Sequence, residues 1–185
     1  MIIFVSGRKG TGKTTVANYL GKRFNVTPVA FADKLKDMLY ELCILFDLPI
    51  ASRHDLDNPI TKEKYRRLMQ VFGTEVCQKY FGRTCWASLI DASKAPVTII
   101  SDLRFKHELR YFQRQGHKCV IVNVVRKGCN GDSHHSEQLN VHSLGVKVIE
   151  IKNNSTLENL FQDLNSIELW VLILFFTGNV YREVE

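Results

Sequence analysis

A glycine-rich segment with one lysine and one threonine at fixed positions lies close to the amino terminus. It reads Gly-Arg-Lys-Gly-Thr-Gly-Lys-Thr over residues 7–14, which is the pattern G-x-x-x-x-G-K-[ST] of a phosphate-binding loop, or P-loop. Its glycines let the backbone wrap phosphate oxygens, and a following helix would present free N–H groups and its positive dipole end. Lys13 is placed to reach β- and γ-phosphates, and the Thr14 hydroxyl to coordinate Mg²⁺.

A chance match in a glycine turn is the alternative, and the flanking residues argue against it. The apolar run Ile2–Val5 predicts a buried strand before the loop, and residues 13–24 predict a helix after it. A P-loop needs this strand–loop–helix context. The residues expected to bind ATP are Gly7, Lys9, Gly10, Thr11, Gly12, Lys13, Thr14 and Thr15.

A P-loop alone does not separate kinases from GTPases, motor ATPases or regulatory nucleotide-binding modules. The N-K-x-D motif of common GTPases does not occur, and 185 residues are few for a helicase or a motor. Several acidic and basic residues also follow predicted strands further along the chain. Together these features favour a kinase that acts on a small molecule.

The elements that must position these residues alternate between strands and helices. Strands are expected at residues 2–5, 28–31, 97–101, 119–125 and 146–151. This alternation predicts an α/β fold with a doubly wound, parallel, five-stranded sheet and helices on both faces. Ligands of such sheets bind beyond the carboxyl ends of the strands. Gly7, Asp33, Asp102 and Arg126 follow these ends, so we expect them to converge on one cleft.

The helices are predicted from apolar spacing and capping residues. Asp33 is expected to cap a helix that begins at Lys34, and Ser155 a final helix that runs to Asn165. Thr61 is expected to cap a long helix. The buried stripe of that long helix is predicted to comprise Tyr65, Leu68, Met69, Phe72 and Val76. No linker or repeat interrupts the chain, which predicts a single domain over residues 1–185.

Composition narrows the partners. The formal net charge is +6, and the basic residues are dispersed rather than blocked, which favours small phosphorylated substrates over nucleic acid. The five cysteines are odd in number and form no C-x-x-C pair, so a reducing, cytoplasmic compartment is expected. No signal peptide is expected before the P-loop, because the first apolar residues lead directly into it. The longest apolar run, residues 169–176, is too short to cross a bilayer, which needs about 20 residues.

Four further segments carry a family resemblance. They are Phe31–Lys36 (FADKLK), Gln70–Glu75 (QVFGTE), Ser101–Glu108 (SDLRFKHE) and His134–Glu137 (HHSE). With the P-loop, they resemble the deoxynucleoside monophosphate kinases of bacteriophages and some large DNA viruses, in order and as far as about Leu164. The resemblance implies a core, an acceptor-binding region and a lid. It also implies the reaction ATP + dNMP → ADP + dNDP, with Mg²⁺ as cofactor and the host cytoplasm as location.

The resemblance also suggests roles at the end of the third predicted strand. P-loop proteins commonly place an acidic residue of the Mg²⁺ shell there, as Asp102 would be, although Asp102 could instead cap the next helix. An arginine just beyond this strand binds the acceptor phosphate in related kinases, as Arg104 would, because a guanidinium suits bidentate contacts. An ion pair of Arg104 with Glu108 is the alternative, and that pair could also orient Arg104.

The other acceptor residues are less specific. Asp33 could orient the acceptor or simply cap its helix, and Lys36 could face phosphates or solvent. Arg66 and Gln70 lie on a polar helix face that could border the acceptor, where the Gln70 amide could pair with a base edge. Two aromatic residues, Phe72 and Trp86, could stack on a base, but a place in the core is favoured for both.

A lid is expected over residues 126–137, which are polar and contain glycine. Arg126 and Lys127 begin it, and a lid cation would stabilise the charge of the transferring group. His134 and His135 have no thiolate partners for zinc, so a role in the lid is favoured, with Glu137 holding a lid arginine.

The tail, residues 168–185, departs from the family pattern. It is expected to pack on the domain or, second, to form a homodimer contact. Two other functions stay open: a kinase of another small phosphorylated acceptor such as phosphomevalonate, and a non-catalytic nucleotide-binding protein.

Overall fold

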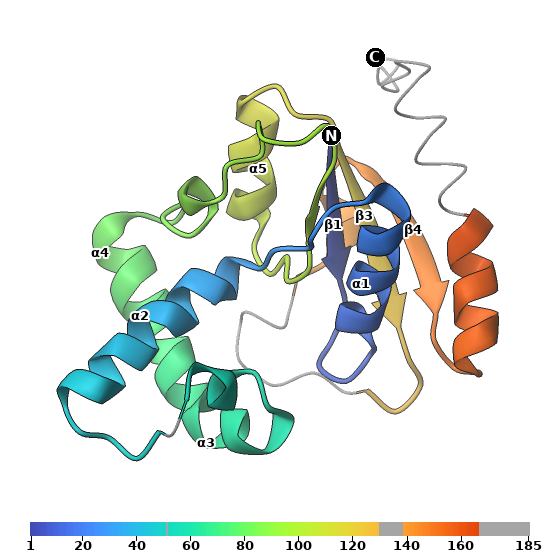
Figure 1. Cartoon of the computed structure of the whole chain (residues 1–185). Coiled ribbons are helices and arrows are strands. Elements are labelled where there is room, and N and C mark those ends of the chain that lie inside the picture. Colours follow the sequence, from blue (N-terminus) through green and yellow to red (C-terminus); the bar gives the residue numbers. More distant parts are fainter. Residues whose placement is uncertain (51, 130–138, 167–185) are drawn as a thin grey trace.

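Four strands form a single parallel sheet in the computed structural model, which describes residues 1–50, 52–129 and 139–166. The strands are β1 (Ile2–Ser6), β2 (Thr98–Ile100), β3 (Cys119–Val125) and β4 (Lys147–Lys152). Their order is β2-β1-β3-β4, and every neighbouring pair is parallel (Figure 1). The predicted α/β fold with a parallel sheet is therefore confirmed.

The predicted count of five strands is wrong for the described chain, because the expected strand at residues 28–31 is reduced to a single bridge. Val29 pairs with Ile100, donating its N–H to Ile99 O and accepting from Ser101 N–H. Pro28 has no N–H to donate to the hydrogen bonds of a sheet, and the helix α2 already begins at Phe31. Only Val29 is left to extend the sheet beside β2.

The main helices are α1 (Lys13–Phe24), α2 (Phe31–Leu45), α3 (Pro59–Gln70), α4 (Lys79–Phe81) and α5 (Lys106–Arg114). Between α3 and α4 the chain continues as a π-helix, η2 (Val71–Gln78). Short 3₁₀ turns lie at η1 (Arg53–Leu56), η3 (Ala87–Leu89) and η5 (Val141–Ser143). A last helix covers residues 157–166. The prediction for α1 matches at both ends.

Side chains on alternate positions of the strands face two different cores, as the two-residue period of a strand requires. Ile3 and Val5 of β1 pack with α1 and with Leu160 and Leu164 of the last helix. Ile2 and Phe4 face the other way and pack against Leu109 and Phe112 of α5. Helices thus cover both faces of the sheet (Figure 1).

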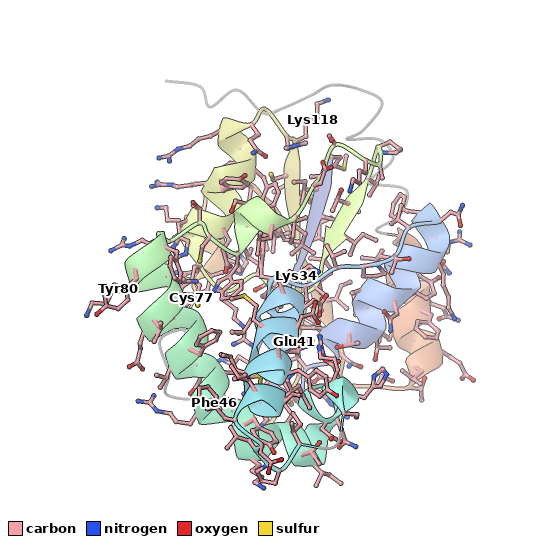
Figure 2. All side chains as sticks on the ribbon, turned by 60° about the vertical axis from the view of Figure 1, so that its left-hand side comes forward. Lys34, Glu41, Phe46, Cys77, Tyr80 and Lys118 are labelled. Atoms are coloured by element: carbon pink, nitrogen blue, oxygen red, sulfur yellow. The ribbon has the colours of Figure 1, made fainter. Side chains whose placement is uncertain are left out.

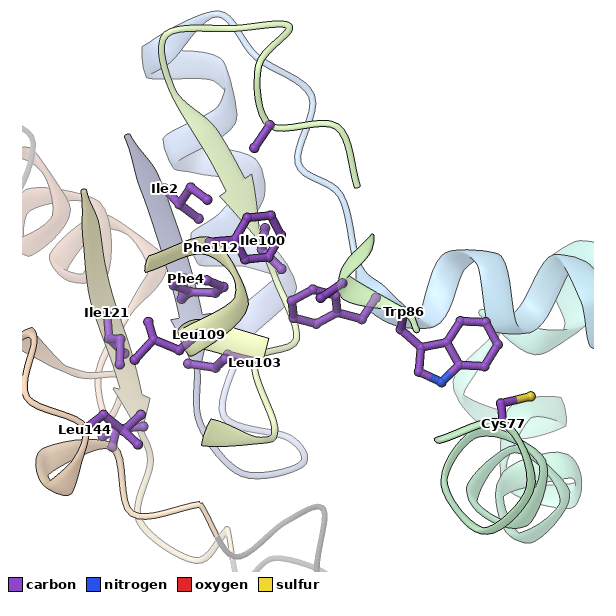
Figure 3. Close-up of a cluster of buried hydrophobic side chains, with 14 residues drawn as sticks. Ile2, Phe4, Cys77, Trp86, Ile100, Leu103, Leu109, Phe112, Ile121 and Leu144 are labelled. Carbon is purple, nitrogen blue, oxygen red and sulfur yellow. The ribbon is translucent and has the colours of Figure 1, made fainter. Parts of the chain in front are cut away.

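The second of these cores extends beyond the sheet to the helical region formed by α2, α3 and η2. Figure 3 shows it running from Ile2, Phe4 and Phe112 as far as Trp86, which lies near Cys77 of η2. Because this apolar contact is continuous, the helical region is held against the carboxyl edge of the sheet. A third, smaller core joins α2 to α3 and consists of Leu39, Cys43, Ile50, Leu56, Tyr65 and Met69.

The outer surface of the helical region carries exposed apolar side chains. Tyr80 of α4 is 71% exposed and points away from the molecule, and Phe46, at the end of α2, is 68% exposed (Figure 2). Ile44, Leu45 and Leu48 near Phe46 are exposed as well, and so is Phe81 beside Tyr80.

Three predicted caps differ from those observed. α2 begins before Asp33, whose carboxylate accepts the Ala30 N–H from the first turn, at 2.9 Å. Asn58 caps α3, accepting the Ile60 N–H at 2.9 Å. Thr61 lies inside that helix, and its hydroxyl donates to Asp55 O. Thr156, rather than Ser155, accepts the Asn159 N–H at the start of the last helix.

The predicted apolar stripe of the long helix is only partly buried. Tyr65 and Met69 are buried as expected, but Leu68 is 41% exposed and Val76 37% exposed. The prediction assumed one continuous α-helix, whereas the chain changes to the wider π-helix after Gln70. Val76 lies beyond that point and faces another direction than an α-helical pattern assigns to it. Leu68 precedes the change, which does not explain its exposure.

Within the described residues, none of the helices has the length and apolarity that a membrane crossing requires. The tail at residues 168–185 lies outside the described residues, as do residues 130–137 of the predicted lid.

Candidate active site

The P-loop follows β1 and leads into α1, and two of its glycines stand where no side chain fits. Gly7 has φ +141°, and a Cβ there would lie 2.3 Å from the carbonyl oxygen of Val124. Gly12 has φ +97°, and a Cβ there would lie 2.5 Å from Nδ2 of Asn153. L-residues rarely adopt such φ values. These glycines let the loop fold tightly against β3 and the segment after β4.

The lysine and threonine side chains of the loop close it internally. Lys13 Nζ donates to the carbonyl oxygens of Gly7, at 2.6 Å, and Arg8, at 2.8 Å. The buried Thr11 hydroxyl also donates to Arg8 O, at 2.9 Å. Lys13 therefore lies across the loop, where its ammonium group would meet phosphate oxygens cradled by the same backbone.

Asn153, just after β4, anchors the loop from behind and was missed by the sequence analysis. It is 9% exposed, and its Nδ2 donates to the carbonyl oxygen of Thr11 at 2.8 Å. Its own N–H donates to Val125 O at the end of β3. This one residue ties the P-loop to two strand ends. The role of Asn153 is revealed only by its close approach to Gly12. It could not be predicted, because the two residues are far apart in the sequence.

A first cavity, of about 440 Å³, lies over the P-loop at the carboxyl ends of β1 and β3. Its lining includes Gly7, Arg8, Thr11 and Lys13 from the loop and Arg126 from the end of β3. Asp102 and Arg104, which follow β2, also belong to its lining. The predicted convergence on one cleft agrees with this lining for Gly7, Asp102 and Arg126, but Asp33, which was predicted to join them, does not line the cavity.

A second, smaller cavity, of about 100 Å³, lies between α2, the α3–η2 helical run and the segment after β2. Asp102 and Arg104 line it as well, so the two cavities adjoin at these residues. Four of the residues predicted to bind the acceptor also line it: Lys36, Arg66, Gln70 and Glu108. Asp33, the remaining candidate, lines neither cavity, and its carboxylate bonds to the Ala30 N–H.

Four cationic side chains converge on this second cavity: Lys36, Lys62, Arg66 and Arg104. Lys62 was not among the predicted acceptor residues and is half-buried here. Removal from water, together with the neighbouring charges of Lys36 and Arg104, lowers its pKa. Concentrated positive charge of this kind favours an anionic ligand. Its spacing of four residues from Arg66 and eight from Gln70 was the available sequence signal.

Lys36 is held by an ion-pair network rather than by solvent. Its side chain is 8% exposed, and Nζ donates to Asp57 Oδ1 at 2.6 Å and lies 3.7 Å from Asp33 Oδ1. Arg53 Nη1 donates to the other oxygen of Asp57, at 2.6 Å, and its Nε donates to Asp37. The solvated alternative for Lys36 is wrong, because this network fixes the ammonium group in the cavity wall.

The two carboxyl groups at the junction both accept backbone N–H groups. Asp102 accepts those of Phe31, at 2.7 Å, and Ala32, at 2.9 Å, at the start of α2. Glu108 Oε2 accepts those of Arg104 and Phe105, both at 2.9 Å. Glu108 thus fixes the backbone that carries Arg104.

Burial raises the pKa of both junction carboxyls. The pKa of Glu108 rises to about 8, and that of Asp102 rises for the same reason, with opposing contributions from its hydrogen bonds. Glu108 is therefore largely protonated at neutral pH, and the cavity keeps its positive character.

Few side-chain oxygens are available for the Mg²⁺ site predicted at Asp102 and Thr14. Both Asp102 oxygens already accept N–H groups from α2. Thr14 is exposed at the start of α1. Among the residues that the structure describes, no three His, Cys, Asp or Glu side chains cluster as metal ligands.

The remaining predicted residues divide between the donor side and the undescribed segment. Lys9 lies at the P-loop surface and pairs with Glu63 of α3, and Gly10 and Thr15 lie in the loop and the first turn of α1. Lys127 donates its N–H to Asn154 Oδ1. His135 and Glu137 fall outside the described residues.

Of the two aromatic candidates for base stacking, only one lines the second cavity. Trp86 is 7% exposed, belongs to the second core and lines the second cavity, where its Nε1 donates to Gly73 O at 2.9 Å. Phe72 packs against the same core without lining that cavity. The core role favoured for both agrees with this packing.

A parallel sheet with a P-loop after its central strand, a donor-side cavity and an adjoining cationic cavity defines a P-loop kinase. Comparison with known proteins identifies the family: a sequence model of the deoxynucleotide monophosphate kinases matches residues 51–164. The chain belongs to this family and is a phosphotransferase.

Individual relatives agree with this family. A protein of Acanthamoeba polyphaga mimivirus, provisionally assigned as a deoxynucleotide monophosphate kinase, is 25% identical over 185 residues, covering 90% of this chain and 95% of the relative. The deoxynucleotide monophosphate kinase of Escherichia phage RB69 is 27% identical over 63% of this chain, which spans half of that relative. The phosphomevalonate kinase of Drosophila melanogaster is 28% identical over 60% of this chain and 59% of the relative.

A solved structure supports the fold alone. A protein of Chloroflexus aurantiacus, provisionally assigned as a kinase, superposes with a TM-score of 0.51 at 15% sequence identity, covering 96% of this chain and 97% of the other.

Proposed function

We propose that the protein transfers the γ-phosphoryl group of ATP, bound at the P-loop, to the phosphate of a deoxynucleoside monophosphate in the second cavity. The observation that carries this proposal is the junction of the two cavities at Arg104. A donor phosphate over Lys13 and an acceptor phosphate beside Arg104 would meet there. Phosphoryl transfer needs this alignment and charge stabilisation more than covalent help from the protein.

An oxygen of the acceptor phosphate attacks the γ-phosphorus, and the bond from that phosphorus to the β,γ-bridging oxygen breaks. ADP leaves, and the acceptor becomes a diphosphate. Lys13 stabilises charge on the β- and γ-phosphates, and Arg104 holds the acceptor phosphate in a bidentate contact. Arg126, on the wall of the first cavity, supplies a further cation to the transferring group.

Mg²⁺ bound with ATP would neutralise phosphate charge. The exposed Thr14 hydroxyl would hold it, and Asp102 would contribute through the lone pairs that its two N–H bonds leave.

The cationic residues Lys36, Lys62 and Arg66 favour a phosphorylated acceptor but do not by themselves choose its remainder. The likeness to a phosphomevalonate kinase keeps a second candidate, a kinase of another small phosphorylated acceptor. Membership of the deoxynucleotide monophosphate kinase family makes the deoxynucleotide the stronger choice.

We infer a cytoplasmic place of action. All five cysteines carry free thiols, which fits a reducing compartment. Neither nucleic acid nor a membrane is needed for the reaction, and the homodimer considered for residues 168–185 stays a prediction.

ADP release measured in a coupled assay, with Mg²⁺, ATP and a panel of acceptors, tests the function. The panel holds the four dNMPs, the four NMPs and phosphomevalonate. We expect turnover with at least one dNMP. Turnover with phosphomevalonate alone would overturn the substrate class. ATP binding without turnover of any acceptor would instead indicate a non-catalytic nucleotide-binding protein.

A further inference from the structure

A line of polar side chains at four-residue spacing runs along one wall of the second cavity. Its members are Lys62, Arg66, Gln70, Thr74 and Gln78, and all five line the cavity. They come from one continuous helical run, with the first three in α3 and the last two in the π-helix η2.

A regular α-helix could not keep this line on one face. With 3.6 residues per turn, every fourth residue overshoots a full turn, so Gln78 would point about 160° away from Lys62. A π-helical turn, closed by i→i+5 bonds, is wider, and a fourth residue there falls short of a full turn. The smaller rotation about the helix axis after Gln70 therefore offsets the excess rotation before it. The change from α3 to η2 therefore brings Thr74 and Gln78 back to the cavity.

The chemistry changes along the line. Lys62 and Arg66 are cationic, whereas Gln70, Thr74 and Gln78 are neutral and carry both donor and acceptor capacity. The cationic end lies at the P-loop, because Glu63, in the same turn as Lys62, pairs with Lys9 at 2.6 Å. The neutral end lies away from the phosphates. This is the polarity of a nucleoside monophosphate, which is anionic at one end and carries a neutral base at the other.

Gln78 lies at the neutral end with its amide unused. The residue is 8% exposed, and within the described part of the chain its side chain makes no hydrogen bond. Among the described residues, His107 Nε2 is the only buried side-chain atom that lacks a hydrogen-bond partner, so the unpaired amide of Gln78 still reaches solvent. Gln78 lines the second cavity, so its amide is available to pair with a ligand there.

Trp86 cannot form a hydrogen bond to the ligand with its side chain, although it lines the same end of the cavity. Its indole N–H is its single hydrogen-bonding group, and that group already donates to Gly73 O of η2, at 2.9 Å. Trp86 offers the ligand an apolar surface only. Discrimination by hydrogen bonds is left to the side chains of the helical line.

We propose that Gln78 is a specificity-determining residue whose amide pairs with the base of the acceptor nucleotide, because the π-helix η2 turns it into the acceptor cavity. An amide offers one donor and one acceptor side by side, which matches the paired donor and acceptor atoms on the edge of a nucleobase. This inference rests on the proposed function, since it names the part of a dNMP that this end of the cavity contacts.

The test compares kcat/KM for the four dNMPs in the unmodified protein and in two variants. Gln78→Leu keeps a similar volume and removes both hydrogen-bonding atoms. It should lower kcat/KM for the preferred dNMP by about three- to tenfold, the range for losing one neutral hydrogen bond, and should narrow the spread among bases. The KM for ATP should not change. Gln113→Leu, at an exposed position on α5, is the matched control and should change none of these values.

Gln78→Glu gives a signature that a purely structural role would not produce. A carboxylate only accepts hydrogen bonds, and guanine presents two neighbouring donors on its pairing edge. The preference for dGMP over the other dNMPs should therefore rise relative to the unmodified protein. Thermal melting of both variants checks that they fold.

Equal loss for all four dNMPs in folded Gln78→Leu, with base preferences unchanged in Gln78→Glu, would overturn the proposal and leave the kinase function standing. Failure of the unmodified protein to phosphorylate any dNMP would instead remove the proposed function itself. The two failures are thus distinguishable in one data set.

Discussion

Lys9 of the P-loop and Glu63 of α3 form an ion pair of 2.6 Å that joins the donor side of the site to the acceptor side. Glu63 also accepts from Nε of Arg66, which lines the acceptor cavity. Both cations lie where phosphates are expected to bind. Glu63 therefore competes with substrate phosphates for the two side chains that it holds.

Removing this competition should favour binding of both substrates. We expect Glu63→Gln to lower the KM values for ATP and for the dNMP by a few-fold, with kcat nearly unchanged, since Glu63 contacts no reacting atom. Steady-state kinetics with each substrate varied in turn measures this, with Glu41→Gln on the exposed side of α2 as the control. A rise in both KM values would mean that Glu63 instead holds Lys9 and Arg66 in their productive places.

The Lys13 ammonium group is expected to follow the β- and γ-phosphates into the transition state. Lys13→Ala should lower kcat by about 10²-fold or more, the scale for losing one preorganised electrostatic contact. Single-turnover kinetics with saturating substrates gives the rate of the chemical step. Lys22→Ala, on the exposed side of the same helix, should keep normal turnover. A folded Lys13→Ala protein with near-native kcat would exclude a catalytic role for the P-loop lysine.

Arg104 borders both cavities, and we assign it to the acceptor phosphate. Arg104→Lys should raise the acceptor KM while changing the affinity for ATP little, because an ammonium group cannot reproduce a planar bidentate contact. Isothermal titration with ATP and kinetics with varied dNMP separate the two effects. The exposed Arg110→Lys on α5 is the control. If ATP affinity falls while the acceptor KM holds, Arg104 belongs to the donor side.

Glu108 links stability to pH because burial raises its pKa to about 8 from an ordinary value of 4.5. Between these values the folded state binds a proton that the unfolded state releases, so the free energy of unfolding falls as pH rises through this interval. Gln is always neutral and can still accept from the Arg104 and Phe105 N–H groups. Glu108→Gln should therefore lose less stability than the unmodified protein between pH 6 and pH 9.

Urea unfolding at several pH values measures this difference. Because other groups titrate equally in both proteins, the comparison isolates Glu108. Parallel stability curves across the whole interval would show that Glu108 ionises normally in the folded protein.

The local pattern of the sequence was enough to predict the P-loop, its strand and its helix. A glycine that must adopt positive φ, a lysine after it and an apolar strand before it are contiguous in the chain, and their chemistry needs no distant partner. The same holds for the convergence of Gly7, Asp102 and Arg126, because strand direction in a parallel sheet sends every carboxyl end to one edge.

Only the tertiary structure decided the acceptor side. The α-helical period assigned Val76 to the core and gave Gln78 no role, because nothing in the residue types signals a change to a π-helix at Val71. Likewise, Lys62 gains a place in the acceptor cavity only because α2 and the segment after β2 line that cavity with it. Asn153 gains its role only when β4 brings it beneath the P-loop. These roles depend on contacts between segments far apart in the chain, and the directions of their side chains are settled by packing rather than by local propensity.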